Sequence, residues 1–553
     1  MGRRCAVLAA AAVTAAGSFE RHSLRFSRGF HVGLCRRPAA VRLLQPRWRG
    51  VSCLGGRQPM QDMEQSKIGF ITDCEGNFDY WSKCVELSEV VHFDDAGQLC
   101  FSRSDKADKF IFGGDAFDKG PGDIRIATAL VNFKRRHPER VWMLAGNRDL
   151  NKLRFTAELG EEVVDVLHPV PAYPRAPPQC SLRDFLQQQA GGDAGGDLAA
   201  VNSSANRLRW ILDHTMTAKG AFELRREELA LLQDKVSSTV SDDEVVESFL
   251  DSVVRNDGFV WEYLTECSLA VLFGETLFVH AGVPKDALGW IPSLDMRYLQ
   301  PSENSICGGI QLPEGHTLRE WVDAMNDFLR AGLRDFRAQM SWRSDRSRGG
   351  EGLLAFTSTP ASFQRSIVVE SLLQGGMPTD LSPEVEDYLS RGGVRRVICG
   401  HKPCGDSPFV VMGKCVEFVH CDTTYSDESA KDKRGQVAAA VEVESVASAG
   451  QETESRLHLR GSLSDGRVFD FLLPSRGSQG SAELPGSHPE KVVSGSSAEH
   501  FVGHRTVDGW WVKARLADGS YHLAHGEPGG RKVSYTTRTY EELSSGMQLQ
   551  AGL

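Results

Sequence analysis

The sequence predicts an α/β (α+β) protein in which short buried strands alternate with helices. From residue 67 onward, short apolar runs are separated by segments with helical spacing, which gives a β-α-β-α-β order. Each apolar run also ends in a loop that carries Asp or Asn. In parallel sheets covered by helices, ligands bind at loops that follow the carboxyl ends of the strands.

The first strands are predicted at KIGFIT (67–72), KFIFGGD (109–115) and RVWMLAGN (140–147). Each run is short and apolar and is followed by turn-forming residues, as in a buried strand. Helices are predicted between them at FDYWSKCVELSEV (78–90) and IRIATALVNFKRR (124–136), because apolar residues recur there with helical periodicity.

The core domain is predicted to span residues 67–473 and to contain two insertions. Residues 155–265 are predicted to form a helical cap that includes the flexible stretch GGDAGGD (191–197), and residues 315–390 a second helix-rich insertion. The remaining core strands are predicted at LAVLF (269–273), TLFVH (276–280), VRRVICG (394–400), KCVEFVHCD (414–422) and RVFDFLL (467–473).

A linker and a small β module are predicted after the core. Residues 474–498 are rich in Ser, Gly and Pro, which is typical of a flexible linker. Within residues 499–545, the stretch DGWWVKARLADGSYHLAHG (508–526) alternates apolar and polar residues around Asp-Gly turns. This favours a small β module, for example an SH3-like barrel, whose role could be protein binding.

Composition excludes two classes of protein. No run approaches the roughly 18–20 apolar residues of a membrane-spanning helix. Without residues 1–57 the chain has 52 basic and 72 acidic residues, and a body this acidic offers no basic stripe for a nucleic-acid polymer. The thirteen Cys show no paired spacing and indicate buried thiols in a reducing compartment.

The first 60 residues have the composition of a targeting presequence. Residues 1–57 contain eleven Arg, no Lys and a single acid, Glu20, around the apolar run CAVLAAAAVTAAG. The run resembles a secretory signal and the Arg-rich part a transit peptide, and a bipartite signal uses both. We expect import into an organelle, a plastid or mitochondrion; a disordered basic arm on a cytoplasmic protein is the alternative.

Five loops carry residue types that bind metal ions, and each closes a predicted strand. They are TDCEGN (72–77), GGDAFDKGPGD (113–123), AGNRD (145–149), VHAGVP (279–284) and CGHKP (399–403). Any one of them alone could be an ordinary turn. Together they suit two divalent cations, which need a bridging carboxylate between further O and N ligands.

The loops resemble those of the calcineurin-like metallophosphoesterase superfamily over about residues 67–425. GGDAFDKGPGD and VHAGVP are most similar to the Ser/Thr protein phosphatase and bis(nucleosyl)-tetraphosphatase branch, and TDCEGNFDYW and GNRDLNKLR to a poorly characterised group from microbial eukaryotes. The resemblance implies a four-layer β-sandwich flanked by helices. It implies hydrolysis of a phosphomonoester or phosphoanhydride by direct attack of a metal-bridging hydroxide, on a phosphorylated small molecule or phosphoprotein.

Carried over by position, the resemblance makes five residues metal ligands: Asp73, Asp115, Asn147, His280 and His401. Asp115 would bridge the two ions, which we expect to be Mn, with Fe, Zn or Mg as alternatives. Asp118 and Asp149 would assist catalysis by orienting the ligands.

Three positions depart from the family pattern. Glu75 stands where the family has a His, and as a ligand it would favour hard ions such as Mn²⁺ or Mg²⁺. Arg148 replaces the His that protonates the leaving group in many relatives; it is a poor proton donor but binds phosphate well. Lys119 replaces a phosphate-binding Arg, and Arg343 could be a second phosphate ligand, although a solvated surface Arg is the commoner situation.

These departures leave two functions open. The first is a phosphoesterase that favours nucleotide, polyphosphate or aryl phosphate substrates over phosphoserine, because such leaving groups need less protonation. The second is a weak or inactive phosphoesterase fold that is kept as a binding or scaffold protein.

Overall fold

The computed structural model describes residues 66–104, 107–159, 180–191, 198–297, 308–343, 347–358, 364–423, 437–446, 454–474, 501–530 and 532–546. All of them belong to one compact unit, Gln65–Leu553. The predicted presequence (1–60), residues 192–197 of the predicted flexible stretch and residues 475–498 of the predicted linker lie outside the described residues. Within the described part, no helix is long and apolar enough to cross a membrane.

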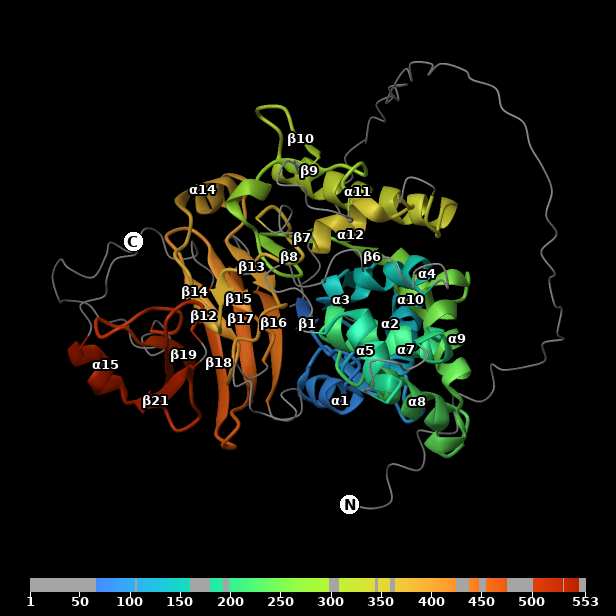
Figure 1. Cartoon of the computed structure of the whole chain (residues 1–553). Helices are drawn as coiled ribbons and strands as arrows, with labels where there is room; N and C mark the ends of the chain where they lie inside the picture. Colours follow the sequence, from blue (N-terminus) through green and yellow to red (C-terminus); the bar gives the residue numbers. More distant parts are fainter. Residues whose placement is uncertain are drawn as a thin grey trace. The chain divides into compact units, whose positions relative to one another are not determined.

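The first sheet has seven strands in the order β18-β17-β16-β1-β4-β5-β6. Figure 1 shows β18, β17, β16 and β1 in this order. The seven strands are β1 (Ser66–Ile71), β4 (Lys109–Phe112), β5 (Val141–Leu144), β6 (Cys267–Ser268), β16 (Ala438–Val446), β17 (Glu454–Ser462) and β18 (Val468–Pro474). β1, β4 and β5 pair in parallel, with Phe70 beside Ile111 and Ile111 beside Trp142. Their carboxyl ends therefore lie at one edge, as the β-α-β-α-β order predicts.

The second sheet has five strands in the order β14-β15-β13-β8-β7. They are β7 (Ala270–Phe273), β8 (Thr276–Val279), β13 (Arg396–Cys399), β14 (Phe409–Met412) and β15 (Glu417–His420). β7 and β8 form a hairpin whose turn places Gly274 at φ 53°, a conformation that glycine adopts without strain. β13 runs parallel to β8, so their carboxyl ends also share an edge.

Apolar side chains from both sheets share one buried cluster. Phe70, Ile111 and Leu144 of the first sheet belong to the same cluster as Phe278 and Ile398 of the second. The rings of Phe70 and Phe278 stack at a centroid distance of 5.8 Å. The two sheets therefore face each other across a shared apolar core, which makes a β-sandwich.

Helices cover the outer faces of the sandwich. α1 (Phe78–Leu87) contacts β1 and β16, and α2 (Asp123–Arg136) contacts β5. α11 (Leu318–Ala338) packs on β7 of the second sheet. Trp81 of α1 and Trp321 of α11 are fully buried. The order helix, sheet, sheet, helix is the layered fold that the sequence predicts.

The described part of residues 155–265 is helical and is joined to α2 by buried charges. It contains α4 (Phe155–Glu158), α5 (Leu182–Gln189), α6 (Leu198–Val201), α7 (Ser204–Trp210), α8 (Ala221–Leu232), α9 (Asp242–Val254) and α10 (Phe259–Thr265). Arg225 of α8 donates to the Asp123 carboxylate at 2.7 Å. Glu228 of α8 accepts from the backbone N–H groups of Ile124 and Arg125, both at 3.1 Å, and so satisfies donors at the start of α2.

The remaining elements are shorter and lie both before and within the second insertion. They are β2 (Val91–Phe93), β3 (Leu99–Phe101), α3 (Asn147–Leu150), β9 (Trp290–Pro292), β10 (Gly309–Gln311), α12 (Glu351–Ser358), β11 (Leu373–Gln374), β12 (Met377–Pro378) and α14 (Pro383–Arg391). Residues 315–390 thus contain three helices in their described part, together with the small hairpin of β11 and β12.

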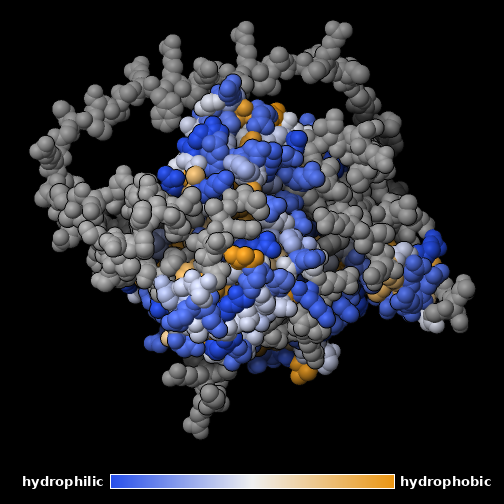
Figure 2. Space-filling model, turned by 90° about the vertical axis from the view of Figure 1, so that its left-hand side faces the viewer, coloured by the Kyte–Doolittle hydropathy of each residue, from blue (hydrophilic) through white to orange (hydrophobic). Residues whose placement is uncertain are grey.

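The C-terminal module, residues 501–546, is one antiparallel sheet followed by a helix. Its elements are β19 (Trp511–Arg515), β20 (Tyr521–His525), β21 (Ser534–Arg538) and α15 (Tyr540–Gly546). The described residues form three strands here and not the barrel suggested by the sequence. In the view of Figure 2, hydrophobic residues show singly or in small groups among hydrophilic ones.

Replacing Arg225 by Ala should strongly destabilise the protein. Arg225 is 3% exposed, and its loss would leave Asp123 and Glu228 buried without their shared cation. Breaking a buried ion pair from one side costs about 3–5 kcal/mol. We expect urea denaturation to show a loss of that order. The neighbouring Arg226 pairs with the more exposed Glu223 and Asp242, so Arg226→Ala should cost roughly 1 kcal/mol or less. Equal losses in both variants would contradict this account.

Candidate metal centre

The five loops meet where the carboxyl ends of the two sheets come together. Asp73, Asp115 and Asn147 follow β1, β4 and β5 of the first sheet. His280 and His401 follow β8 and β13 of the second sheet. The parallel pairing within each sheet therefore brings five sequence-distant side chains to one place.

Asp115 lies at the centre of two groups of possible ligands. Ligand atoms of Asp115, His280 and His401 lie within 4.8 Å of one another, and so do those of Asp73, Glu75 and Asp115. His280 Nε2 lies 3.4 Å from Asp115 Oδ1 and 3.4 Å from Asn147 Oδ1. The carboxylate that belongs to both groups is the one that the sequence assigns as the bridge.

The backbone is strained at these residues. Asp73, Glu75, Asp115, Asp118 and His401 all have positive φ, at 53°, 45°, 53°, 111° and 70°. Such conformations are costly for residues other than glycine and persist where the surrounding structure enforces them, commonly at functional sites. Here the first two loops enforce them on each other, because Asp73 N donates to Gly114 O at 3.0 Å and Glu75 N to Asp115 O at 2.9 Å.

Two glycines let the backbone reach the carboxylates directly. A Cβ on Gly400 would lie 2.0 Å from Asp73 Oδ2, and one on Gly146 would lie 2.2 Å from Asp115 Oδ1. Without these side chains, His401 N donates to Asp73 Oδ2 at 2.9 Å and Arg148 N to Asp115 Oδ1 at 2.8 Å. Backbone N–H groups therefore help to fix the orientation of both the Asp73 and the Asp115 carboxylate.

The buried charges fit divalent cations. Asp73, Glu75 and Asp115 are at most 3% exposed, and three carboxylates so close together repel one another strongly. Burial alone would lower the pKa of His280, yet the adjoining Asp115 carboxylate raises it to about 10. Burial drives the pKa of His401 well below its usual value, which keeps its ring neutral and able to ligate. The donor set of carboxylates, imidazoles and an amide oxygen suits first-row transition metals.

The buried ring nitrogens of His401 also indicate a metal ligand. Both of its ring nitrogens are inaccessible to solvent and make no hydrogen bond of normal geometry with the described residues, although the Val369 backbone lies near the ring. A buried ring in this state is costly unless an ion or water partner completes it.

Arg148 and Lys119 are both paired with Glu75. Arg148 Nε lies 3.1 Å from Glu75 Oε1 and 3.7 Å from Asp115 Oδ2, and Lys119 Nζ lies 2.7 Å from Glu75 Oε2. Arg148 also donates to Thr217 Oγ1 at 3.3 Å, which links it to the cap. Glu75 therefore neutralises two cations at the rim of the site in addition to facing Asp73 and Asp115.

Asp118 and Asp149 contact residues next to the candidate ligands. Asp149 accepts from the backbone N–H groups of Asp115, Ala116 and Gly146 at 2.8–3.0 Å, so it ties the second loop to the third. Burial, followed by the nearby Asp115 carboxylate, raises the pKa of Asp149 to about 7. Asp118 is paired with Lys152 at 2.6 Å and with Arg148 at 3.3 Å. Both carboxylates are placed to support neighbouring groups.

The structure does not join every expected residue to the site and adds others. The hydrogen bonds of Arg343 go to Ser347, and none of its described contacts reaches the five loops. Thr72 and Lys152 were not expected: Thr72 Oγ1 donates to Asp73 Oδ2 at 2.6 Å, and Lys152 is buried against Asp118. The helical spacing of Lys152 from Arg148 was the available signal for it.

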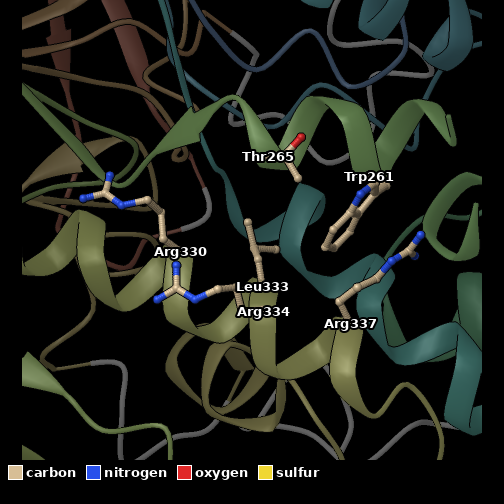
Figure 3. A pocket seen from close by; sticks show the side chains of 6 residues that line it. All are labelled: Trp261, Thr265, Arg330, Leu333, Arg334 and Arg337. Carbon is tan, nitrogen blue, oxygen red and sulfur yellow. The ribbon is translucent and has the colours of Figure 1, made fainter. Parts of the chain in front are cut away.

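A basic hollow lies apart from these loops. It has a volume of about 220 Å³ between α10 and α11, and it is lined by Trp261, Thr265, Arg330, Leu333, Arg334 and Arg337 (Figure 3). Arg337 lies over the Trp261 ring at 4.7 Å, and Arg330 pairs with Asp327 at 2.6 Å. None of the five loops lines this hollow, so it is not part of the candidate metal centre.

The layered fold and the clustered candidate ligands are compatible with a phosphoesterase-type metal centre, and comparison with known proteins supports this class. The family model for calcineurin-like phosphoesterases matches residues 66–180. Residues 66–180 are therefore similar to a calcineurin-like phosphoesterase domain, and this similarity supports a hydrolase of the phosphoesterase class. No curated protein matches the chain.

Solved structures similar to this chain include two phosphatases. One is a cold-active protein-tyrosine phosphatase of the psychrophile Shewanella sp., with 12% identity and a TM-score of 0.36 over 73% of this chain and 80% of that chain. The other is a protein serine/threonine phosphatase from Saccharomyces cerevisiae with similarity to human phosphatase PP5, with 10% identity and a TM-score of 0.28 over 70% and 76%. Both scores are low, so the assignment of the domain rests on the family model.

Replacing Gly400 by Ala should weaken metal binding. The new Cβ would overlap Asp73 Oδ2 and lie 2.5 Å from Thr72 Oγ1, so Asp73 would have to leave its position. Displacing an oriented ligand commonly costs about 10–100-fold in metal affinity, and we expect a loss of that size for Mn²⁺ in isothermal titration calorimetry. Gly308→Ala is a matched control, because its Cβ would meet only an ordinary contact at 3.4 Å. Unchanged affinity in Gly400→Ala would show that Asp73 is not a ligand.

Proposed function

We propose that this phosphoesterase hydrolyses a phosphoanhydride or an aryl phosphate, with nucleotide or polyphosphate substrates favoured over phosphoserine proteins. The observation that carries this proposal is the position of Arg148. It takes the place in the third loop where a proton donor would be expected, with its guanidinium between Glu75 and Asp118.

Arg148 is suited to binding phosphate and unsuited to protonating a leaving group. A guanidinium has a pKa above about 12 and keeps its proton at neutral pH. Asp149 is fully buried and is occupied by backbone donors, so it offers no proton at the surface of the site. An alkoxide leaves poorly without a proton, whereas a phosphate or a phenolate leaves without one.

Arg148 and Lys119 together give the rim of the site its positive charge. Arg148 is 11% exposed and Lys119 39% exposed on their side chains, so Lys119 in particular can reach a substrate. Both are restrained by Glu75, which limits how far they move. We propose that Glu75 orients these two cations toward the phosphate in addition to any role as a ligand.

The proposed cofactors are two divalent cations, with Mn²⁺ first among the alternatives. Asp73, Glu75 and Asp115 would hold one of them, and Asp115, Asn147, His280 and His401 the other. When bound there, divalent cations stabilise charge on phosphoryl oxygens and lower the pKa of water. The carboxylates of the first group favour a hard ion such as Mn²⁺ or Mg²⁺ over Zn²⁺.

The dependence of rate on the leaving group tests the proposal. For a series of aryl phosphates, we expect kcat/KM in Mn²⁺ to fall steeply as the pKa of the phenol rises. Phosphoserine peptides should react more slowly than dinucleoside polyphosphates by about 10²-fold or more, the usual contribution of a general acid. Arg148→His should make the dependence shallower by supplying a proton donor, whereas Arg148→Lys, which keeps a cation, should leave it steep.

Two results would contradict the proposal in different ways. Faster hydrolysis of phosphoserine peptides than of dinucleoside polyphosphates would show that another group protonates the leaving oxygen. Absence of turnover, even of p-nitrophenyl phosphate with added Mn²⁺, would favour the scaffold function instead.

A further inference from the structure

The loop that carries His401 is strained at both ends. It connects β13 to β14, and within it His401 has φ 70° and Ser407 φ 134°. Both are conformations that residues other than glycine rarely adopt and that need external restraint to persist. His401 itself is held by Asp73, and residues 404–406 are restrained by a part of the chain about a hundred residues further on.

Lys513 of β19 supports this loop from below. Its side chain is fully buried, and its ammonium donates to the carbonyl oxygen of Cys404 at 2.5 Å. The ammonium also lies 5.0 Å from the centre of the Phe409 ring and 5.8 Å from that of Tyr535. Cys404 is in turn fixed on its other side, because its N–H donates to the carbonyl of Asp422 at 2.8 Å.

Tyr535 of β21 contacts the next two residues of the loop. Its hydroxyl accepts from the N–H of Asp406 at 3.2 Å. Gly405 has φ 80°, and a Cβ there would lie only 2.1 Å from this hydroxyl, so the tyrosine packs directly on the backbone. The Asp406 carboxylate also accepts from Ser464 N at 2.8 Å, in the turn between β17 and β18.

The module also covers the edge of the second sheet. β14 is the outermost strand of that sheet, and its Met412 N donates to Gly503 O at 2.9 Å. Trp511 meets the ring of Phe409 edge-on at 5.9 Å. Lys513, Tyr535 and Trp511 thus all face the core domain, while the outer face shows few hydrophobic residues (Figure 2).

We propose that the C-terminal module is a positioning element for the metal centre: Lys513 and Tyr535 hold the loop of residues 400–407 and so place His401. The proposal rests on the metal-dependent function proposed above in that His401 is taken as a ligand. It gives the module a role inside the molecule, and protein binding by the module stays a prediction.

The identity of Lys513 supports positioning over simple packing. Burying an ammonium is costly, and a hydrophobic residue of similar size at such a place is often neutral or stabilising. A methionine would fill the space between Phe409 and Tyr535 but would leave the Cys404 carbonyl without its donor. The presence of a lysine at this position is therefore explained by the carbonyl that it holds.

The test uses full-length Lys513→Met and Tyr535→Phe, separately and together. We expect hydrogen–deuterium exchange of the metal-free protein to become faster in residues 400–407 and to stay unchanged in the sheets. We expect Mn²⁺ affinity to fall by about 10–100-fold, as when groups that orient a ligand are removed. The thermal midpoint of Lys513→Met should change little, because removing a buried ammonium offsets the loss of the donor to the Cys404 carbonyl. Lys532→Met and Tyr540→Phe, on exposed residues of the same module, should behave as wild type.

Two results would overturn the proposal, and a third would overturn only the proposed function. Wild-type exchange in residues 400–407 would show that the module does not hold the loop. A uniform rise in exchange with a lower thermal midpoint would assign both residues to general stability. If wild-type protein binds no Mn²⁺, the proposed function fails, and exchange in the metal-free protein still decides whether the loop is held.

Discussion

The constraint on which this structure depends is the close approach of three buried carboxylates, one of which is Asp115. Asp73, Glu75 and Asp115 would repel one another and resist burial unless positive charge faced them. The chain supplies part of that charge through Arg148 and Lys119. Divalent cations would supply the rest, so the fold is arranged around charges that it does not itself fully balance.

Parts of the molecule that are far apart in the sequence converge on the same residues. On one side, Arg225 of the cap binds Asp123, whose carboxylate accepts from Asp118 N at 3.1 Å. Asp118 then contacts Arg148 at the rim of the site. On the other side, the C-terminal module contacts the loop of His401. The insertion and the module therefore both contact loops of the candidate metal centre, and both belong to one compact unit with it.

Much of the core could be predicted from the sequence because local signals agreed with the tertiary structure. Runs such as KFIF (109–112) are apolar and short and are followed by turn residues, and these two signals together locate the strands. Asp115 and His401 each follow such a run, which is why their loops could be expected to converge. The presequence and the flexible linker stay predictions, because they lie outside the described residues.

Other features could not be predicted, for physical reasons that differ. β16 and β17 were missed because AAAVEVESV and ESRLHLRGS carry alanine or charge on one face and lack the continuous apolar run of a buried strand. The ion pairs of Glu75 with Arg148 and Lys119 could not be predicted, because they depend on side-chain rotamers and on the relative positions of the loops that carry these residues. From the sequence, Lys513 is a polar residue in an alternating strand and would be expected at the surface. It is buried because the module packs against Cys404.

The central claim is that Asp115 is shared by two cations, and electron paramagnetic resonance of the Mn²⁺-loaded protein tests it most directly. The account predicts a spin-coupled pair of Mn²⁺ ions in the wild type, and loss of that coupling in Asp115→Asn. A spectrum of isolated Mn²⁺ in the wild type, or coupling that survives in Asp115→Asn, would contradict it.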